Sequence, residues 1–252
     1  MTELREDGFL GGRLRIAQPA QGYRAGADAV MLAAACPARP GDSVLELGCG
    51  AGAALLCLGA RVPGLRLAGL ELQPAYAELA RRNAAANAIP AELHEGDLAR
   101  MPAALRGQSF DHVIANPPYF TGGPPAPDAG RGRARHEATP LPLWIEAGLR
   151  RLRPGGWLTL IQRSERLAEI LAALSAAAGA ITILPVAARE GREAGRIIVA
   201  ARKGARAPLR LLSPFVMHAK PLHSADEEDL TGAAQAVLRE GAALSLGGPN
   251  FR

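Results

Sequence analysis

The sequence is poor in cysteine, and this shortage limits the kinds of protein it can encode. Only three of its 252 residues are cysteines, namely Cys36, Cys49 and Cys57. Their number is odd and no two of them form a Cys-x-x-Cys pair, which argues against a disulfide framework and against a cysteine-ligated zinc site. We therefore expect three reduced thiols and no metal.

Two further absences concern membranes and nucleoside triphosphates. Behind its charged start, the chain has no apolar run of signal-peptide or transmembrane length. We therefore expect a cytoplasmic protein that does not enter a membrane. The sequence also has no Gly-Lys-Ser/Thr tripeptide, which argues against the phosphate-binding loop of nucleoside triphosphatases.

Aromatic residues make up 4% and hydrophobic residues 48% of the chain. A chain of this length and composition can bury a full core, and we expect a single domain over 1–252, with an N-terminal part (1–40), a central core (41–205) and a C-terminal extension (206–252). The formal net charge is +5, although only Lys203 and Lys220 are lysines. A basic balance fits a polyanionic partner such as RNA. It is weak evidence alone, because a codon-biased genome also enriches a chain in Arg, Ala, Gly and Pro.

Strand-like and helix-like segments alternate along the chain after a predicted hairpin over 8–18. Such alternation is typical of a parallel sheet covered by helices. We expect an α/β fold of the Rossmann-like type, with a seven-stranded, mostly parallel sheet, an antiparallel final hairpin and an N-terminal β-hairpin extension. The predicted strands begin at Ser43 and then cover 67–70, 91–94, 110–115, 157–161, 181–184 and 196–200.

The first strand of this core runs into a glycine-rich turn, Glu46-Leu-Gly-Cys-Gly-Ala-Gly52, which opens a helix over 53–61. Glycines in such a turn allow a ligand to approach the backbone closely. Glu71 ends the next strand about twenty residues later, where a carboxylate accepts hydrogen bonds from a ribose diol. The pattern predicts a nucleoside-containing cofactor, and the alternative is that Glu71 is an ordinary surface residue.

A second candidate site follows the strand at 110–115. Two prolines after Asn116 end this strand and turn the chain out of the sheet. The Asn116 side-chain oxygen and the Pro117 carbonyl then accept the two hydrogens of a planar amine, while Tyr119 or Phe120 stacks on a flat base. Asn-Pro-Pro-Tyr by itself is also compatible with a simple surface turn.

Three other features stay open at the level of residues. Asp97 either accepts a hydrogen bond from an adenine amino group or caps the turn after Gly96. Asp28 either borders a ligand or caps a helix, and Arg24 either borders a ligand or is a solvated side chain. The run 121–137 is rich in Gly and Pro and carries three arginines, so we read it as a lid that grips phosphates, with an idle insertion as the alternative.

Taken together, the glycine turn, Glu71 and the Asn116-Pro-Pro-Tyr119 turn at successive strand ends resemble a class I S-adenosylmethionine-dependent methyltransferase. Within that superfamily the chain is similar to the tRNA adenine-N6 methyltransferases that modify the adenosine next to the anticodon of a valine tRNA. The segments Gly22-Tyr-Arg-Ala-Gly-Ala-Asp28, Leu70-Glu-Leu-Gln73 and Arg135-His-Glu137 also resemble that family. The match covers roughly 9–225. It departs at Ala27, where the family often has Thr.

The resemblance implies a role for each matched residue. Arg24, Gly26 and Asp28 border the methionine moiety of S-adenosylmethionine, the glycine turn cradles it, Glu71 holds the ribose and Asp97 the adenine. The implied cofactor residues are Arg24, Gly26, Asp28, Glu46, Gly48, Cys49, Gly50, Gly52, Glu71, Leu72, Asp97 and Asn116. The implied catalytic residues are Asn116, Pro117, Pro118 and Tyr119, and those for RNA are Phe120, Arg131, Arg133, Arg135 and His136.

Two alternative functions remain at this stage. A protein-glutamine methyltransferase uses the same Asn-Pro-Pro-Tyr turn, because an amide nitrogen is equally planar; the basic loop and the missing N-terminal helical domain argue against it. A noncatalytic RNA-binding module that kept the cofactor fold is the other, and the intact Asn116 turn argues against it.

Overall fold

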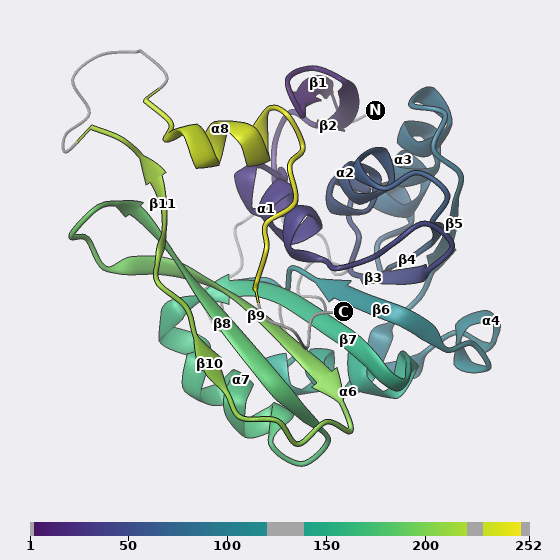
Figure 1. Cartoon of the computed structure of the whole chain (residues 1–252). Helices are drawn as coiled ribbons and strands as arrows, with labels where there is room; N and C mark the ends of the chain where they lie inside the picture. Colours follow the sequence, from purple (N-terminus) through teal and green to yellow (C-terminus); the bar gives the residue numbers. More distant parts are fainter. Residues whose placement is uncertain (1–2, 120–138, 221–228, 248–252) are drawn as a thin grey trace.

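A computed structural model describes residues 3–119, 139–220 and 229–247 (Figure 1). The chain begins with the predicted hairpin, in which β1 (Leu4–Phe9) pairs antiparallel with β2 (Leu14–Pro19). The turn between them contains Gly11 and Gly12 at φ +67° and +85°, which glycine adopts without a steric penalty. The hairpin is thereby confirmed, and its first strand begins earlier than expected.

The central sheet contains the seven predicted strands in the order β8-β9-β7-β6-β3-β4-β5. Strands β3 to β7 are parallel, and β9 lies antiparallel between β7 and β8. The mostly parallel sheet with an antiparallel hairpin is therefore confirmed. The bounds are β3 (Ser43–Leu47), β4 (Arg66–Glu71), β5 (Ala91–Glu95), β6 (Phe110–Ala115), β7 (Leu152–Arg163), β8 (Ala178–Arg189) and β9 (Ala194–Lys203).

Two short strands lengthen the sheet beyond the expected seven. Both β10 (Arg210–Leu211) and β11 (Phe215–His218) pair parallel with β8, so the sheet of the described residues has nine strands. They cover the edge strand β8, which reduces the unpaired backbone at that side of the sheet.

Helices cover both faces of the sheet (Figure 1). On one face lie α1 (Ala27–Ala35), α2 (Ala53–Arg61) and α3 (Pro74–Ala86), which pack on the core around Ile114 and Ile198. On the other face lie α6 (Leu141–Arg151) and α7 (Leu167–Leu174), around Val113 and Val199. The remaining helical segments are η1 (Leu98–Arg100), α4 (Ala103–Arg106), η2 (Ser164–Arg166) and α8 (Gly232–Leu238).

A short helical segment, η2, comes directly before α7. Ser164 does not cap α7, because it opens the short segment η2 and its hydroxyl donates a hydrogen bond to the Ala194 carbonyl. The residue before α7 is Arg166.

Side-chain amides on α3 attach the N-terminal hairpin to the core. Asn83 accepts from the Ala17 backbone N–H at 2.9 Å and donates to the Ala17 carbonyl at 3.0 Å. Asn87, one turn later, makes the same pair of bonds to Arg15. The two amides pair with backbone N–H and carbonyl groups of β2, as the backbone of a neighbouring strand would. The attached hairpin therefore holds the segment that follows it, 20–26, at the carboxyl edge of the sheet.

Within the described ranges, no helix has the length and hydropathy needed to cross a membrane. Over the same ranges, no group of three or more His, Cys, Asp or Glu side chains is arranged to hold a metal ion.

Candidate active site

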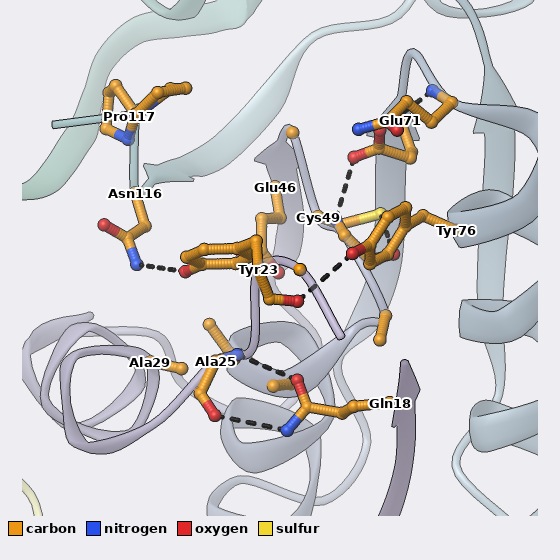
Figure 2. A pocket seen from close by; sticks show the side chains of 18 of the residues that line it. Gln18, Tyr23, Ala25, Ala29, Glu46, Cys49, Glu71, Tyr76, Asn116 and Pro117 are labelled. Carbon is orange, nitrogen blue, oxygen red and sulfur yellow. Dashed lines mark hydrogen bonds between the residues drawn. The ribbon is translucent and has the colours of Figure 1, made fainter. Parts of the chain in front are cut away.

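A cavity of about 330 Å³ lies where the parallel strands β3, β4 and β6 end (Figure 2). This is the edge at which open α/β sheets bind ligands. The cavity is lined by the segment after β2, the glycine turn, the end of β4 and the turn after β6. Its lining comprises Gln18, Gly22, Tyr23, Ala25, Ala29, Glu46, Gly48, Cys49, Gly50, Ala51, Ala53, Ala54, Glu71, Gln73, Tyr76, Asn116, Pro117, Pro118 and Tyr119.

The glycine turn forms one wall of the cavity. Gly48, Gly50 and Gly52 all have positive φ, at 64°, 54° and 87°, a conformation that side-chain-bearing residues rarely adopt. Gly48 and Gly50 line the cavity, whereas Gly52 does not. Gly52 instead precedes α2, and a Cβ there would lie 3.4 Å from the Ala80 side chain. The first two glycines therefore shape the ligand surface, and the third is favoured by its positive φ at the start of α2.

Glu71 fixes this wall from the end of β4. Its Oε2 accepts from the Gly50 backbone N–H at 2.9 Å, and its Oε1 accepts from the Gln73 N–H at 2.8 Å. The residue is only 2% exposed, so Glu71 is not an ordinary surface residue. Each carboxylate oxygen has a second acceptor site, and Glu71 can therefore take further hydrogen bonds from hydroxyl groups of a ligand in the cavity.

Glu46 is a second carboxylate in the same wall. It is 3% exposed, and its Oε2 accepts from the Leu55 backbone N–H at 2.8 Å. Burial raises the pKa of Glu46 well above its ordinary value, and the nearby charge of Glu71 adds to the effect. Among the described residues, no Lys or Arg forms an ion pair with it. A buried carboxylate that faces a cavity in this way suits a cationic ligand group.

The opposite wall is the turn after β6. The Asn116 side-chain N–H donates to the Tyr23 hydroxyl at 3.2 Å (Figure 2). This contact holds the nitrogen end of the amide and leaves Oδ1 able to accept a hydrogen bond from a ligand. The Pro117 carbonyl accepts a hydrogen bond from Gln162 Nε2 at 3.2 Å. Tyr23 as a residue is 58% exposed, but its hydroxyl points into the cavity, where loss of water together with the charges of Glu46 and Asp28 raises the pKa of Tyr23 to about 12.

Tyr119 ends this turn and is held by two charged residues. Its hydroxyl donates to Asp28 Oδ2 at 2.5 Å, and Arg196 Nε donates to the same oxygen at 3.2 Å. The Arg196 guanidinium carbon lies 4.4 Å from the centre of the Tyr119 ring, a cation–π distance. Burial, together with Asp28, raises the pKa of Tyr119. The ring is therefore anchored at its hydroxyl and covered by a cation.

The segment 24–28 lies at the edge of the cavity, which it lines through Ala25. Asp28 binds Tyr119 and Arg196, and Arg24 forms an ion pair with Asp7 of β1. Gly26 precedes α1. None of Arg24, Gly26 and Asp28 is among the lining residues.

Leu72 and Asp97 lie at a second, smaller cavity. This cavity is lined by Gly48, Leu70, Leu72, Gly96, Asp97, Leu98 and Thr139. Gly48 belongs to both cavities, so the second adjoins the first across the glycine turn. Asp97 Oδ1 accepts from the Ala99 N–H at 2.8 Å. Asp97 thus caps η1, and its other oxygen faces no hydrogen-bond donor among the described residues.

Four residues of the site had no role in the sequence analysis. Gln18 makes two hydrogen bonds to Ala25, to its N–H and to its carbonyl, and so closes the loop that carries Tyr23. Tyr76 of α3 donates to the Tyr23 carbonyl at 3.1 Å. Tyr23 in turn holds Asn116, and Gln162 holds Pro117. Tyr23 lies inside a quoted motif, whereas Gln162 comes directly after the predicted strand 157–161 and was given no role.

The predicted RNA-binding residues Phe120, Arg131, Arg133, Arg135 and His136, with the 121–137 run, lie outside the described residues.

Comparison with known proteins agrees with this geometry. A family model described as a methyltransferase domain matches residues 44–128. A tRNA1(Val) (adenine(37)-N6)-methyltransferase of Porphyromonas gingivalis is 36% identical over 173 residues, which cover 65% of this chain and 68% of the relative. A protein of the same name from Dickeya chrysanthemi is 26% identical over 242 residues, covering 94% of each chain. The crystal structure of a predicted O-methyltransferase from Agrobacterium tumefaciens is 30% identical, with a TM-score of 0.70 over 86% of this chain and 98% of that one.

Fold, cavity and relatives define the protein as an enzyme of the class I methyltransferases, whose methyl donor is S-adenosylmethionine. The residues fit that cofactor, because Glu46, a buried carboxylate without an ion-pair partner in the described part of the chain, suits its ammonium group and Glu71 suits its ribose hydroxyls. More narrowly, the chain belongs to the family of the tRNA1(Val) (adenine(37)-N6)-methyltransferases.

Proposed function

We propose that the protein methylates the N6 nitrogen of an adenine in RNA, and that this RNA is a tRNA with the target adenine next to the anticodon. The observation that carries the proposal is that Asn116 and Pro117, each with a neutral acceptor oxygen, both line one end of the cavity. The printed names of the relatives supply the class of RNA.

The acceptor pair selects the atom to be methylated. An exocyclic amine is a poor nucleophile because its lone pair is delocalised into the ring. Two oxygens that accept its two hydrogens draw the nitrogen toward a tetrahedral geometry and localise the lone pair. A hydroxyl has only one hydrogen and does not need the second acceptor, so the turn favours transfer to nitrogen over transfer to oxygen.

The cofactor half of the cavity has its own set of residues. When bound, S-adenosylmethionine supplies a methyl group that its sulfonium makes electrophilic. Glu46 would pair with the ammonium group, Glu71 would accept from the ribose hydroxyls, and Leu72 with Asp97 would border the adenine. Gly48 and Gly50 would let the backbone lie against the ligand. Arg24, Gly26 and Asp28 would border the methionine end from outside the cavity lining.

Tyr119 would stack on the target base, a contact worth roughly 1–3 kcal/mol in nucleic-acid binders. Adenines in a structured anticodon arm are stacked on their neighbours, so the base must leave the stack to reach Asn116. Phe120, Arg131, Arg133, Arg135 and His136 would hold the RNA around it.

The test is incubation with labelled S-adenosylmethionine and either total tRNA or an unmodified valine tRNA transcript, followed by digestion to nucleosides. We expect N6-methyladenosine as the labelled product. Asn116→Ala is the matched control: it should bind the cofactor nearly normally and lose transfer by at least about a hundredfold, the cost of removing a catalytic hydrogen-bonding group. Label in another nucleoside or in the glutamine residues of added protein would contradict the proposal.

A further inference from the structure

The Pro117 carbonyl is held in an unusual way. Strand β6 ends at Ala115, which pairs with Leu160 of the parallel strand β7. Continuing that register would place residue 117 opposite Gln162. Pro117 and Pro118 have no backbone N–H, so the backbone ladder cannot continue through these two residues.

The Gln162 side chain supplies the missing contact. It is 0% exposed, its Nε2 donates to the Pro117 carbonyl at 3.2 Å, and its Oε1 accepts from the Arg163 N–H at 2.9 Å. The second bond fixes which end of the amide faces the turn, because only the nitrogen end can donate. The carbonyl of Pro117 is therefore held by a side-chain amide whose own orientation is set by the backbone.

We propose that Gln162 is a positioning residue of methyl transfer, which rests on the function proposed above. A carbonyl oxygen has two acceptor sites. Gln162 occupies one of them and so directs the other toward the target amine. It does for Pro117 what Tyr23 does for Asn116, and together the two contacts set both acceptors at the distance and angle that the amine requires.

The hydrogen bond of Gln162 would need no catalytic explanation if every buried polar side chain on β7 had to be hydrogen-bonded for the strand to form. Thr159 shows that this is not required. It lies on the same strand and is also 0% exposed, and its hydroxyl has no hydrogen-bond partner among the described residues. Gln162, in contrast, is directed at a carbonyl of a residue that lines the cavity.

Two substitutions separate positioning from stability. Gln162→Met keeps the length of the side chain but cannot donate, and we expect kcat to fall roughly 10- to 100-fold, the effect of misplacing a reacting group by about 1 Å. The KM for RNA and the Kd for S-adenosylmethionine, measured by calorimetry, should stay within about twofold. Thr159→Val, the matched control on β7, should leave all three unchanged.

Gln162→Glu gives a signature that stability alone would not give. The introduced carboxyl keeps the acceptor for Arg163, but it donates to Pro117 only when protonated, and its burial raises its pKa. Its kcat should be low at pH 8 and should recover toward pH 6, whereas the wild type and Thr159→Val should show no such recovery.

A wild-type kcat in Gln162→Met would overturn the inference, and so would a Gln162→Glu enzyme that follows the wild-type pH profile. If Gln162→Met does not fold, the pH profile of Gln162→Glu decides. The product formed by the wild type tests the proposed function separately: methylation of a different planar nitrogen would refute adenine N6 as the target, and the variants would still be compared on that product.

Discussion

The proposed cofactor end and the proposed target end of the cavity are held by different kinds of contact. At the cofactor end, Glu46 and Glu71 accept hydrogen bonds from backbone N–H groups no more than 21 residues away. At the target end, Tyr23 holds Asn116 from 93 residues before it, Asp28 holds Tyr119 from 91 residues before it, and Gln162 holds Pro117 from 45 residues after it. The cofactor end is thus built locally, and the target end depends on how distant segments pack.

This contrast predicts that substitutions at the two ends affect different measurements. At the cofactor end, Glu71→Ala removes the acceptor for ribose and also for the Gly50 N–H. We expect S-adenosylmethionine to bind about 10- to 150-fold more weakly, equivalent to roughly 1.5–3 kcal/mol for hydrogen bonds to a charged group. Calorimetry measures this directly.

Glu71→Gln is the matched variant, since it keeps one oxygen acceptor and should lose less affinity than Glu71→Ala. At saturating cofactor, Glu71→Ala should recover much of its kcat, because the target end does not depend on it. Unchanged cofactor affinity in Glu71→Ala would remove Glu71 from the cofactor site.

At the target end, Tyr119 should affect turnover and leave cofactor affinity unchanged. Tyr119→Ala loses base stacking of roughly 1–3 kcal/mol, which is about 5- to 150-fold in turnover. Tyr119→Phe loses the hydrogen bond to Asp28 but keeps the ring face that stacks on the base, so we expect a smaller decrease than in Tyr119→Ala.

Asp28→Asn is the control for the Tyr119 series, because its side-chain oxygen still accepts from the Tyr119 hydroxyl. Single-turnover kinetics at saturating cofactor would measure all three variants. A Tyr119→Phe enzyme as inactive as Tyr119→Ala would show that the hydroxyl, rather than the ring face, carries the function.

The same contrast explains how much could be predicted from the sequence. The strand at 110–115 was predicted with its observed bounds, because a short β-branched run between breakers carries its own signal. The glycine turn and Glu71 were likewise placed together, since their spacing reflects one strand-turn-helix-strand unit. These features depend on neighbours in the chain.

Features that depend on distant partners were missed. Strands β10 and β11 have two and four residues and form only because β8 offers an open edge. Tyr23 and Gln162 carry no spacing signal toward Asn116 and Pro117. The contacts of Asp28 with Tyr119 and Arg196, which lie 91 and 168 residues away, had no signal in the sequence either.

The smallest effect we predict separates binding from stability at the cofactor end. Burial raises the pKa of Glu46 in the folded protein above the value it has in the unfolded chain. Below the pKa of the group in the unfolded chain, near 4.3, its contribution to the free energy of unfolding is fully present. This contribution is lost as the pH rises through the pKa of the group in the folded protein. At neutral pH the buried carboxylate therefore lowers the free energy of unfolding when no cationic ligand is present.

Glu46→Gln removes this penalty while its side-chain oxygen can still accept from the Leu55 N–H. We expect the variant to unfold a few degrees higher than the wild type at pH 8, since about 1 kcal/mol corresponds to about 2–4 °C for a chain of this size. The difference should vanish near pH 4, where the wild-type carboxyl is also neutral. Added S-adenosylmethionine should reverse the order at pH 8, because its ammonium group pairs with Glu46 only in the wild type. Thermal unfolding of both proteins at the two pH values, with and without cofactor, measures this. The same difference in unfolding temperature at both pH values would show that the pKa of Glu46 is not raised in the folded protein.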